Sequence, residues 1–158
     1  MVPSGVGNSP ARRTGAGTSG FSVVVGVDLV RVGDVVSSIA RFGDRYTHRI
    51  FTDGEIEYCS QEPHLTAERF AVRFAAKEAT LKVLRLRRTD TVSWRSIEVR
   101  REPEGWCDIV LHDAARMVAD REGISGLSVS MSHEHEYATA TVVAHRAIDE
   151  RESRETIG

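Results

Sequence analysis

The spacing of apolar residues changes partway along this 158-residue chain, and that change limits the possible folds more than any other feature. After one β-branched run at residues 21–30, the apolar residues of segment 32–42 recur every three or four positions, as on one face of a helix. From Ile97 onward they alternate with polar residues, as in half-buried strands. The sequence therefore predicts a single α+β domain in which a mostly antiparallel sheet packs on a long helix.

Local signals indicate where the expected elements begin and end. Thr52 and Glu55 form a capping-box pattern at the start of a short helix that ends before Pro63. Gly123 is placed to end the last helix. In chain order we expect a strand at 21–30, helices at 32–42, 52–58 and 66–85, paired strands at 97–99 and 107–111 joined by a turn at 103–105, a helix at 113–122, and a closing hairpin of 127–132 and 137–145.

The two ends of the chain differ in composition from the segment between them. Residues 1–20 are rich in Gly, Ser, Thr and Pro, which predicts a disordered tail. Residues 15–20 spell G-x-G-x-x-G, but that pattern binds dinucleotides where it follows a strand, and here it precedes the first one. We expect a Gly/Ser-rich tail at 1–20, one domain at 21–146 and a charged tail at 147–158.

Charge and cysteine content argue against several classes of protein. The 21 basic and 23 acidic side chains leave a net charge of −2, so we expect no nucleic-acid partner bound by bulk charge. No apolar run approaches the roughly 20 residues that span a bilayer, so we expect no membrane partner. Cys59 and Cys107 form neither a disulfide framework nor a zinc site, which predicts a reduced, cytoplasmic protein.

Asp28 is the first candidate for chemistry, because it interrupts an otherwise apolar strand. A carboxylate among apolar neighbours is costly to bury unless it is paired, hydrogen-bonded or holding a cation. The alternative is a strand end that faces water, where the charge needs no partner.

The helix expected at 66–85 carries the second candidate site. Glu78 and Lys82 lie one turn apart, next to small alanines that would let another surface approach closely. An exposed pair of this kind on a helix surface stabilises by only about 0.3–0.5 kcal/mol, and such a pair is the simpler interpretation.

The lysine content favours a functional interpretation. The chain has 19 arginines, and its only lysines are Lys77 and Lys82. A lysine supplies a compact ammonium that binds phosphate as a point charge and can exchange a proton. Carboxylate ligands with a lysine beside them suit Mg2+ on a pyrophosphate, because Mg2+ is usually held by one or two carboxylates and substrate oxygens.

Two further patterns leave alternatives open. Basic residues crowd the region around the helix, either as a solvated face or as a site for an anionic ligand or an acidic partner protein. They are Arg69, Arg73, Arg85, Arg87, Arg88, Arg95, Arg100 and Arg101. The H-x-H of His133 and His135 lacks the third and fourth ligands that zinc requires.

Four segments together resemble a known family, holo-acyl-carrier-protein synthase, the small AcpS-type 4'-phosphopantetheinyl transferase. They are Gly26-Val27-Asp28-Leu29, Arg49-Ile50-Phe51-Thr52, Arg73-Phe74-Ala75-Ala76-Lys77-Glu78-Ala79 with Lys82, and Val129-Ser130-Met131-Ser132-His133-Glu134 with Tyr137-Ala138. Their order and spacing agree with the family from about residue 23 to residue 144. The F-A-A-K-E-A-x-x-K block with an upstream G-x-D is the specific part of the match.

The resemblance implies an enzyme that transfers the 4'-phosphopantetheine arm of coenzyme A to a serine of an apo acyl carrier protein and releases 3',5'-ADP. By position, Asp28 and Glu78 would hold Mg2+, and both would be catalytic together with Lys82. Lys82, Lys77, His133 and Arg73 would bind coenzyme A. The family implies a homotrimer with active sites between subunits, which would suit the small residues Ala71 and Ala75 as an interface, and carriers of fatty acid or polyketide synthesis.

The chain departs from the family pattern at several positions. Arg85-Leu86-Arg87 replaces a Gly-Thr-Gly turn, and Gly105-Trp106-Cys107 replaces a Gly-Lys-Pro turn. Arg31 stands where a glutamate is expected, and Asp34 where a basic residue of the carrier-binding helix is expected. These positions favour a second hypothesis, a lapsed or repurposed relative that binds a carrier or coenzyme A without transfer. A third is an unrelated α+β nucleotide-binding module.

Overall fold

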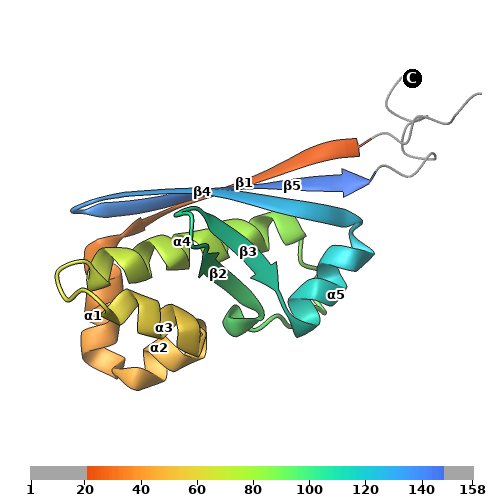
Figure 1. The fold of residues 1–158 in the computed structure, drawn as a ribbon. Coiled ribbons are helices and arrows are strands. Elements are labelled where there is room, and N and C mark those ends of the chain that lie inside the picture. The colour runs from red at the N-terminus through yellow and green to blue at the C-terminus, as the bar shows by residue number, and fades with distance from the viewer. Residues whose placement is uncertain (1–20, 148–158) are drawn as a thin grey trace, which may run out of the picture.

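The computed structural model describes residues 21–147, and all of their strand pairs are antiparallel (Figure 1). The elements are β1 (Phe21–Arg31), α1 (Val32–Phe42), α2 (Asp44–Ile50), α3 (Asp53–Ser60), α4 (Thr66–Leu84), the 3-10 turn η1 (Trp94–Ser96), β2 (Ile97–Arg101), β3 (Cys107–Leu111), α5 (Asp113–Arg121), β4 (Ile124–Glu134) and β5 (Tyr137–Ala147). The tail expected at 1–20, with its G-x-G-x-x-G segment, lies outside the described residues, as does the tail expected at 147–158 except for Ala147, which is the last residue of β5.

The α+β class and the antiparallel pairing are confirmed, but the strands form two sheets. One has the order β1-β5-β4, and the other is the hairpin β2-β3. The closing hairpin is longer than expected, because β4 begins at Ile124 and β5 extends through Ala147. The capping box of α3 is present as predicted, with Thr52 Oγ1 accepting from Glu55 N and Glu55 Oε2 accepting from Thr52 N.

Helix α2 was not among the expected elements. Gly43, with a positive φ of 56°, ends α1 and lets a second helix begin at Asp44. Thr47 and Ile50 are the residues of α2 that become buried. Its seven residues are too short to show a helical period in the sequence, and packing against the rest of the chain holds the helix in place.

Helix α4 runs along one face of the three-stranded sheet, at a close distance that small residues permit (Figure 1). A Cβ atom at Gly26 would lie 2.2 Å from the carbonyl oxygen of Ala79, so β1 and α4 meet there backbone to backbone. Ala71 and Ala75 are fully buried in the core of this same chain. The expectation that these alanines form a subunit interface is therefore wrong, because they serve the helix–sheet contact within one protomer.

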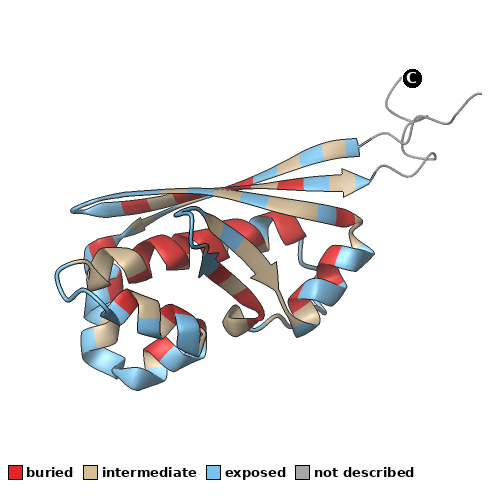
Figure 2. Cartoon of the chain, viewed as in Figure 1, coloured by how far each residue is buried: buried red, intermediate tan, exposed pale blue. Residues whose placement is uncertain are grey.

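Most of the circumference of α4 is buried, as its red colour in Figure 2 shows. In its C-terminal half four residues remain partly accessible, and we call them the open strip: Phe74, Glu78, Leu81 and Lys82. They are three or four residues apart or adjacent, so they share one side of the helix. The open strip is where the C-terminal half of α4 can meet a ligand.

The opposite face of the three-stranded sheet carries exposed apolar side chains along β1. This outer-face stripe consists of Phe21, Val23, Val25, Val27 and Leu29, each of which is more than half exposed. The residues alternate with inward-facing ones, as the period of a strand requires. In Figure 1 the described helices lie on the other side of the sheet, which leaves this stripe uncovered within one chain.

Candidate active site

Asp28 lies on the face of β1 that packs against α4. It follows buried Gly26 by two residues, so both side-chain positions point the same way, and its side chain is only 18% exposed. The ammonium of Lys82 lies 2.9 Å from Asp28 Oδ1 and also donates to the carbonyl of Val27. Asp28 is therefore a paired carboxylate facing the helix, rather than a strand end facing open water.

Glu78 lies near Asp28, and its pKa reflects that proximity. Partial burial raises the pKa of Glu78, and the charge of Asp28 raises it further, whereas the ammonium of Lys82 lowers it. A carboxylate whose pKa is raised by a second carboxylate close to it lies where a cation is favoured. The sequence placed Glu78 and Lys82 side by side as one helical pair, but the ion pair of Lys82 is with Asp28 on β1.

Asp28 and Glu78 line the same groove, which has a volume of about 690 Å3. Its lining comes from β1, α1, α2, α4 and η1: Asp28, Leu29, Val30, Arg31, Asp34, Val35, Ser38, Tyr46, Ile50, Phe74, Glu78 and Trp94. The rings of Phe74 and Trp94 stack at 5.3 Å between centroids and form an aromatic wall. The groove thus combines an acidic end with an apolar wall.

The donor set at the acidic end suits a hard divalent cation that also binds substrate. Within residues 21–147 no group of three or more His, Cys, Asp or Glu side chains is arranged to hold a metal ion. Asp28 and Glu78 supply two carboxylates, so further ligands would have to be water or substrate oxygens. That is the usual environment of Mg2+, which keeps part of its shell for water and phosphate oxygens.

Lys77 is not in the groove, and the expectation that it binds coenzyme A is wrong. Its side chain is fully buried, and its ammonium lies 2.8 Å from Glu55 Oε2. The same ammonium donates to the backbone carbonyls of Trp94, at 3.1 Å, and Ile97. All three N–H donors are therefore used inside the protein. Burial lowers the pKa of Lys77, and the carboxylate of Glu55 opposes that shift.

Arg73 and His133 lie together, but in a second pocket of about 300 Å3. That pocket is lined by Tyr58, Leu65, Arg69, Val72, Arg73, Arg101, Cys107, Met131 and His133. Three guanidinium groups surround one ring: those of Arg73, Arg69 and Arg101 lie 4.3, 4.6 and 5.9 Å from the centroid of Tyr58. His133 Nδ1 lies 3.4 Å from a carboxylate oxygen of Glu68. The charge of the arginines suits an anionic ligand.

The two pockets share no lining residue, and α4 separates them. Arg73 and Glu78 are five residues apart, so their side chains leave the helix in directions about 140° apart. One chain therefore brings Asp28, Glu78 and Lys82 together and places Arg73 and His133 elsewhere. In the sequence, Arg69 and Arg101 are only part of a basic stretch, and nothing there predicts that they meet at Tyr58. They do so because the tertiary structure brings α3, α4 and β2 together.

Of the two arginines that replace the Gly-Thr-Gly turn, Arg85 keeps a glycine-like backbone. Arg85 ends α4 in the left-handed region, with φ 49° and ψ 54°, a conformation that favours glycine. Arg87 N donates to Asp90 Oδ2 at 2.7 Å, and Asp90 forms two hydrogen bonds with Arg121. The chain thus retains a turn of the glycine type and anchors it by ion pairs.

Residues 21–147 include no helix whose length and apolarity would let it cross a bilayer.

Comparison with known proteins agrees with this geometry. A model of the 4'-phosphopantetheinyl transferase superfamily matches residues 24–142. A holo-[acyl-carrier-protein] synthase of Koribacter versatilis is 43% identical over 118 residues, covering 75% of this chain and 94% of that protein. The corresponding synthase of Dehalococcoides mccartyi is 41% identical over 120 residues, covering 75% of this chain and 95% of that one.

Solved structures give the same relationship. The holo-[acyl-carrier-protein] synthase of Neisseria meningitidis superposes with a TM-score of 0.68 at 31% identity, covering 76% of this chain and 95% of that one. The Helicobacter pylori synthase in complex with coenzyme A superposes with a TM-score of 0.66 at 27% identity, covering 77% and 99%. These matches, together with the acidic groove and the sheet packed on one long helix, show that the chain belongs to the 4'-phosphopantetheinyl transferase superfamily and to its holo-[acyl-carrier-protein] synthase family.

Proposed function

We propose that this chain transfers the 4'-phosphopantetheine arm of coenzyme A to a serine of an apo acyl carrier protein, in the presence of Mg2+, and releases 3',5'-ADP. The observation that carries the proposal is the convergence of Asp28 and Glu78, fifty positions apart in the sequence, on one groove beside the ammonium of Lys82. The chemistry follows from the names of the relatives, which are synthases of holo-carrier proteins.

Asp28 and Glu78 would hold Mg2+ in this proposal, with diphosphate oxygens of coenzyme A completing its shell. When bound, the ion would neutralise charge on those oxygens. Lys82 would bind the same diphosphate, since half of its side chain is exposed and its ammonium pairs with Asp28, which lines the groove. Its ammonium would stabilise negative charge that grows on the leaving 3',5'-ADP.

The nucleophile would come from the carrier protein. Its serine oxygen would form a bond to phosphorus and give its proton to a carboxylate of the acidic end or to water there, while the bond from phosphorus to 3',5'-ADP breaks. This chain therefore needs no nucleophile of its own. The residues of the groove would therefore bind, orient and neutralise charge. The aromatic wall of Phe74 and Trp94 would shield the reacting groups from water.

We further propose that the complete active site lies between two copies of the chain in a homotrimer. Arg73 and His133, expected to bind coenzyme A, lie in the second pocket, on another side of α4 from Glu78. A neighbouring copy could present its second pocket to the groove, so that the arginines bind the nucleotide end of coenzyme A. The outer-face stripe supports association, because exposed apolar patches of this kind mark interaction sites.

A transfer assay tests the proposal directly. The protein is mixed with coenzyme A, Mg2+ and a panel of apo carrier proteins, and the mass of each carrier is measured. We expect a carrier to gain the mass of phosphopantetheine, and a chelator to abolish the gain. Tight binding of a carrier without any mass gain would instead support a repurposed relative that does not transfer the arm. Asp34, which lines the groove where a basic residue is expected, favours that alternative.

The variant Glu78→Gln assigns the groove within the same assay. Glu78 is partly exposed on the open strip, so the amide should leave thermal unfolding nearly unchanged. Loss of a direct ligand should lower kcat/KM by at least the roughly 10- to 100-fold that changes to residues supporting a ligand typically cost. Unchanged turnover would remove Glu78 from the site.

A further inference from the structure

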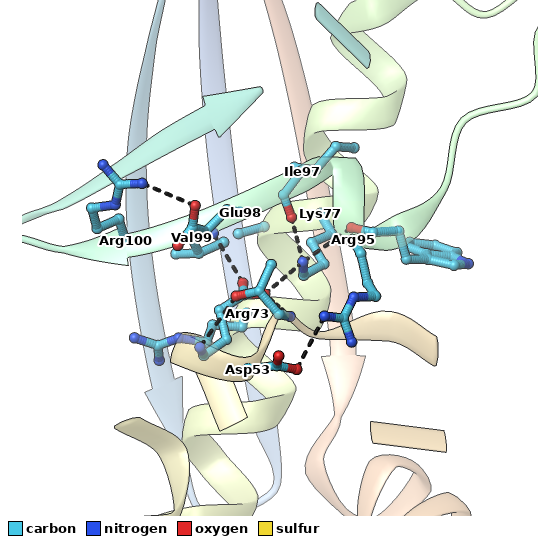
Figure 3. Close-up of polar contacts among 12 residues, drawn as sticks. Asp53, Arg73, Lys77, Arg95, Ile97, Glu98, Val99 and Arg100 are labelled. Carbon is cyan, nitrogen blue, oxygen red and sulfur yellow. Dashed lines mark hydrogen bonds and ion pairs between the residues drawn. The ribbon is translucent and has the colours of Figure 1, made fainter. Parts of the chain in front are cut away.

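The proposed chemistry does not use one buried ion pair, that of Lys77 with Glu55. Figure 3 shows Lys77 among the polar contacts that surround it. Lys77 and Glu55 are both almost completely excluded from solvent, with Nζ 2.8 Å from Oε2. Every polar atom of the pair has a partner. Glu55 Oε2 also accepts from the backbone N–H of Thr52, and Oε1 accepts from that of Val99 at 2.9 Å.

The partners of this pair belong to four different elements. Glu55 lies on α3 and Lys77 on α4, while the backbone groups that they bind belong to η1 and β2 and to the cap of α3. The three donors of the ammonium meet three acceptors: Glu55 and the carbonyls of Trp94 and Ile97. A compact ammonium fits this enclosed position, whereas the planar five-donor guanidinium of arginine would leave donors unpaired.

Two links connect the pair to the groove. Lys77 binds the carbonyl of Trp94, whose ring stacks on Phe74, and both rings line the groove. Lys77 is also the direct neighbour of Glu78, so fixing its side chain fixes the turn of α4 that presents Glu78. The pair therefore holds the aromatic wall and the acidic end at a set distance from each other.

Stability alone gives a weak reason for such a pair. Replacing a buried ion pair with apolar residues of similar volume is often neutral or stabilising, because two desolvated charges are costly. The hydrogen bonds of this pair, which reach four elements, instead hold those elements in a single defined geometry.

We infer that Lys77 and Glu55 are positioning residues of the transfer site. Without contacting substrate, they fix the position of the Trp94 ring in the aromatic wall and the direction in which Glu78 leaves the helix. The inference rests on the proposed function for its catalytic consequence, but its structural consequence can be measured without any transfer. It also accounts for a lysine in this helix that the groove does not need.

The experiment uses Trp94 as a reporter. Trp106→Phe, at an exposed turn, leaves Trp94 as the sole tryptophan, and the variants Glu55→Gln and Glu55→Gln/Lys77→Met are made in that background. Glu55→Gln keeps the volume and one carbonyl acceptor, so it carries the test if the double variant does not fold. Thr80→Val is the matched control, since Thr80 is equally buried in α4, donates to the carbonyl of Ala76 and lies outside the groove lining.

We expect Trp94 emission to shift to the red in the folded Glu55 variants, and Mn2+ affinity in the presence of coenzyme A, measured by EPR, to fall about 10- to 100-fold. Thr80→Val should lose thermal stability with neither change. Unaltered emission and affinity in a folded Glu55 variant would overturn the inference, as would equal changes in Thr80→Val at the same loss of stability. Failure of the wild-type protein to modify any carrier would refute the proposed function. The Trp94 emission of the Glu55 variants would then decide whether Lys77 and Glu55 position the aromatic wall.

Discussion

The two lysines of α4 lie five residues apart, yet one belongs to the interior and the other to the open strip beside the groove. Lys77 is fully buried and binds Glu55 and two backbone carbonyls. The side chain of Lys82 is half exposed on the open strip, where it pairs with Asp28. The same charge thus holds the fold together in one position and faces a ligand in the other, because five residues turn a side chain by about 140° around the helix.

This comparison teaches how the helix combines rigidity with function. The buried circumference of α4 contacts the sheet, α3, β2 and α5. The open strip carries Glu78 and Lys82 on a helix that is fixed everywhere else. Changes on the buried side should therefore cost stability, and should affect activity only through the position of the groove residues. Changes on the groove side should cost activity with little loss of stability.

The largest effect on stability should appear when each of the two lysines is replaced in turn. Lys77→Met leaves the carboxylate of Glu55 buried without its partner, so we expect the free energy of unfolding to fall by about 3–5 kcal/mol. Lys82→Met, on the exposed side, should change it by less than about 1 kcal/mol while reducing transfer. Urea unfolding and the transfer assay measure both. Equal destabilisation by the two variants would break the comparison.

The contact between β1 and α4 should be nearly as sensitive. In Gly26→Ala the new methyl group meets the backbone oxygen of Ala79, which cannot move aside, so we expect a loss of about 3 kcal/mol from overpacking. Gly54→Ala is the control, because nothing lies within 4 Å of that position. A stable Gly26→Ala protein in urea unfolding would mean that the helix lies farther from the sheet.

The cysteines extend the comparison to thiol reactivity. Burial raises the pKa of Cys59 to about 11 from an ordinary value of 9.0, so below pH 9 its thiolate should be about 100-fold rarer than that of a free thiol. We expect iodoacetamide at pH 8 to label Cys107, which is partly exposed, and to label Cys59 only after denaturation. Because its folded pKa is the higher one, Cys59 contributes stability below pH 9 that is lost as the pH rises toward 11. Peptide mass spectrometry measures labelling, and rapid native labelling of Cys59 would contradict its burial.

The smallest effect should come from the groove side, at Asp34. This exposed residue lies in the first turn of α1 and lines the groove. Asp34→Arg should favour acidic carriers by a factor of roughly 2–5, the range of an exposed charge interaction, with little change in the KM for coenzyme A. Competition between two apo carriers measures the preference. Ser37→Arg, on the same helix outside the groove lining, should shift it less.

Much of this organisation could be predicted from local sequence. Asp28 was singled out because a carboxylate interrupts a β-branched strand, and the capping box at Thr52 fixed the start of α3. The short helix α2 could not be predicted, because its stability comes from contacts made by Thr47 and Ile50. Ala71 and Ala75 were assigned to a subunit interface, since small residues permit close packing against any surface and the sequence does not say which.

The sequence by itself determined most of the segments that form helices and strands, α2 excepted, because hydrophobic period, caps and turns are local properties. It also determined the family, through motifs that carry Asp28, Glu78 and Lys82. Only the tertiary structure decided that Lys82 pairs with Asp28, that Lys77 is enclosed by Glu55, and that Arg73 lies in a pocket apart from Glu78. The physical reason is that a helix presents side chains in every direction, and the elements packed around it decide which of them meet each other, water or a ligand.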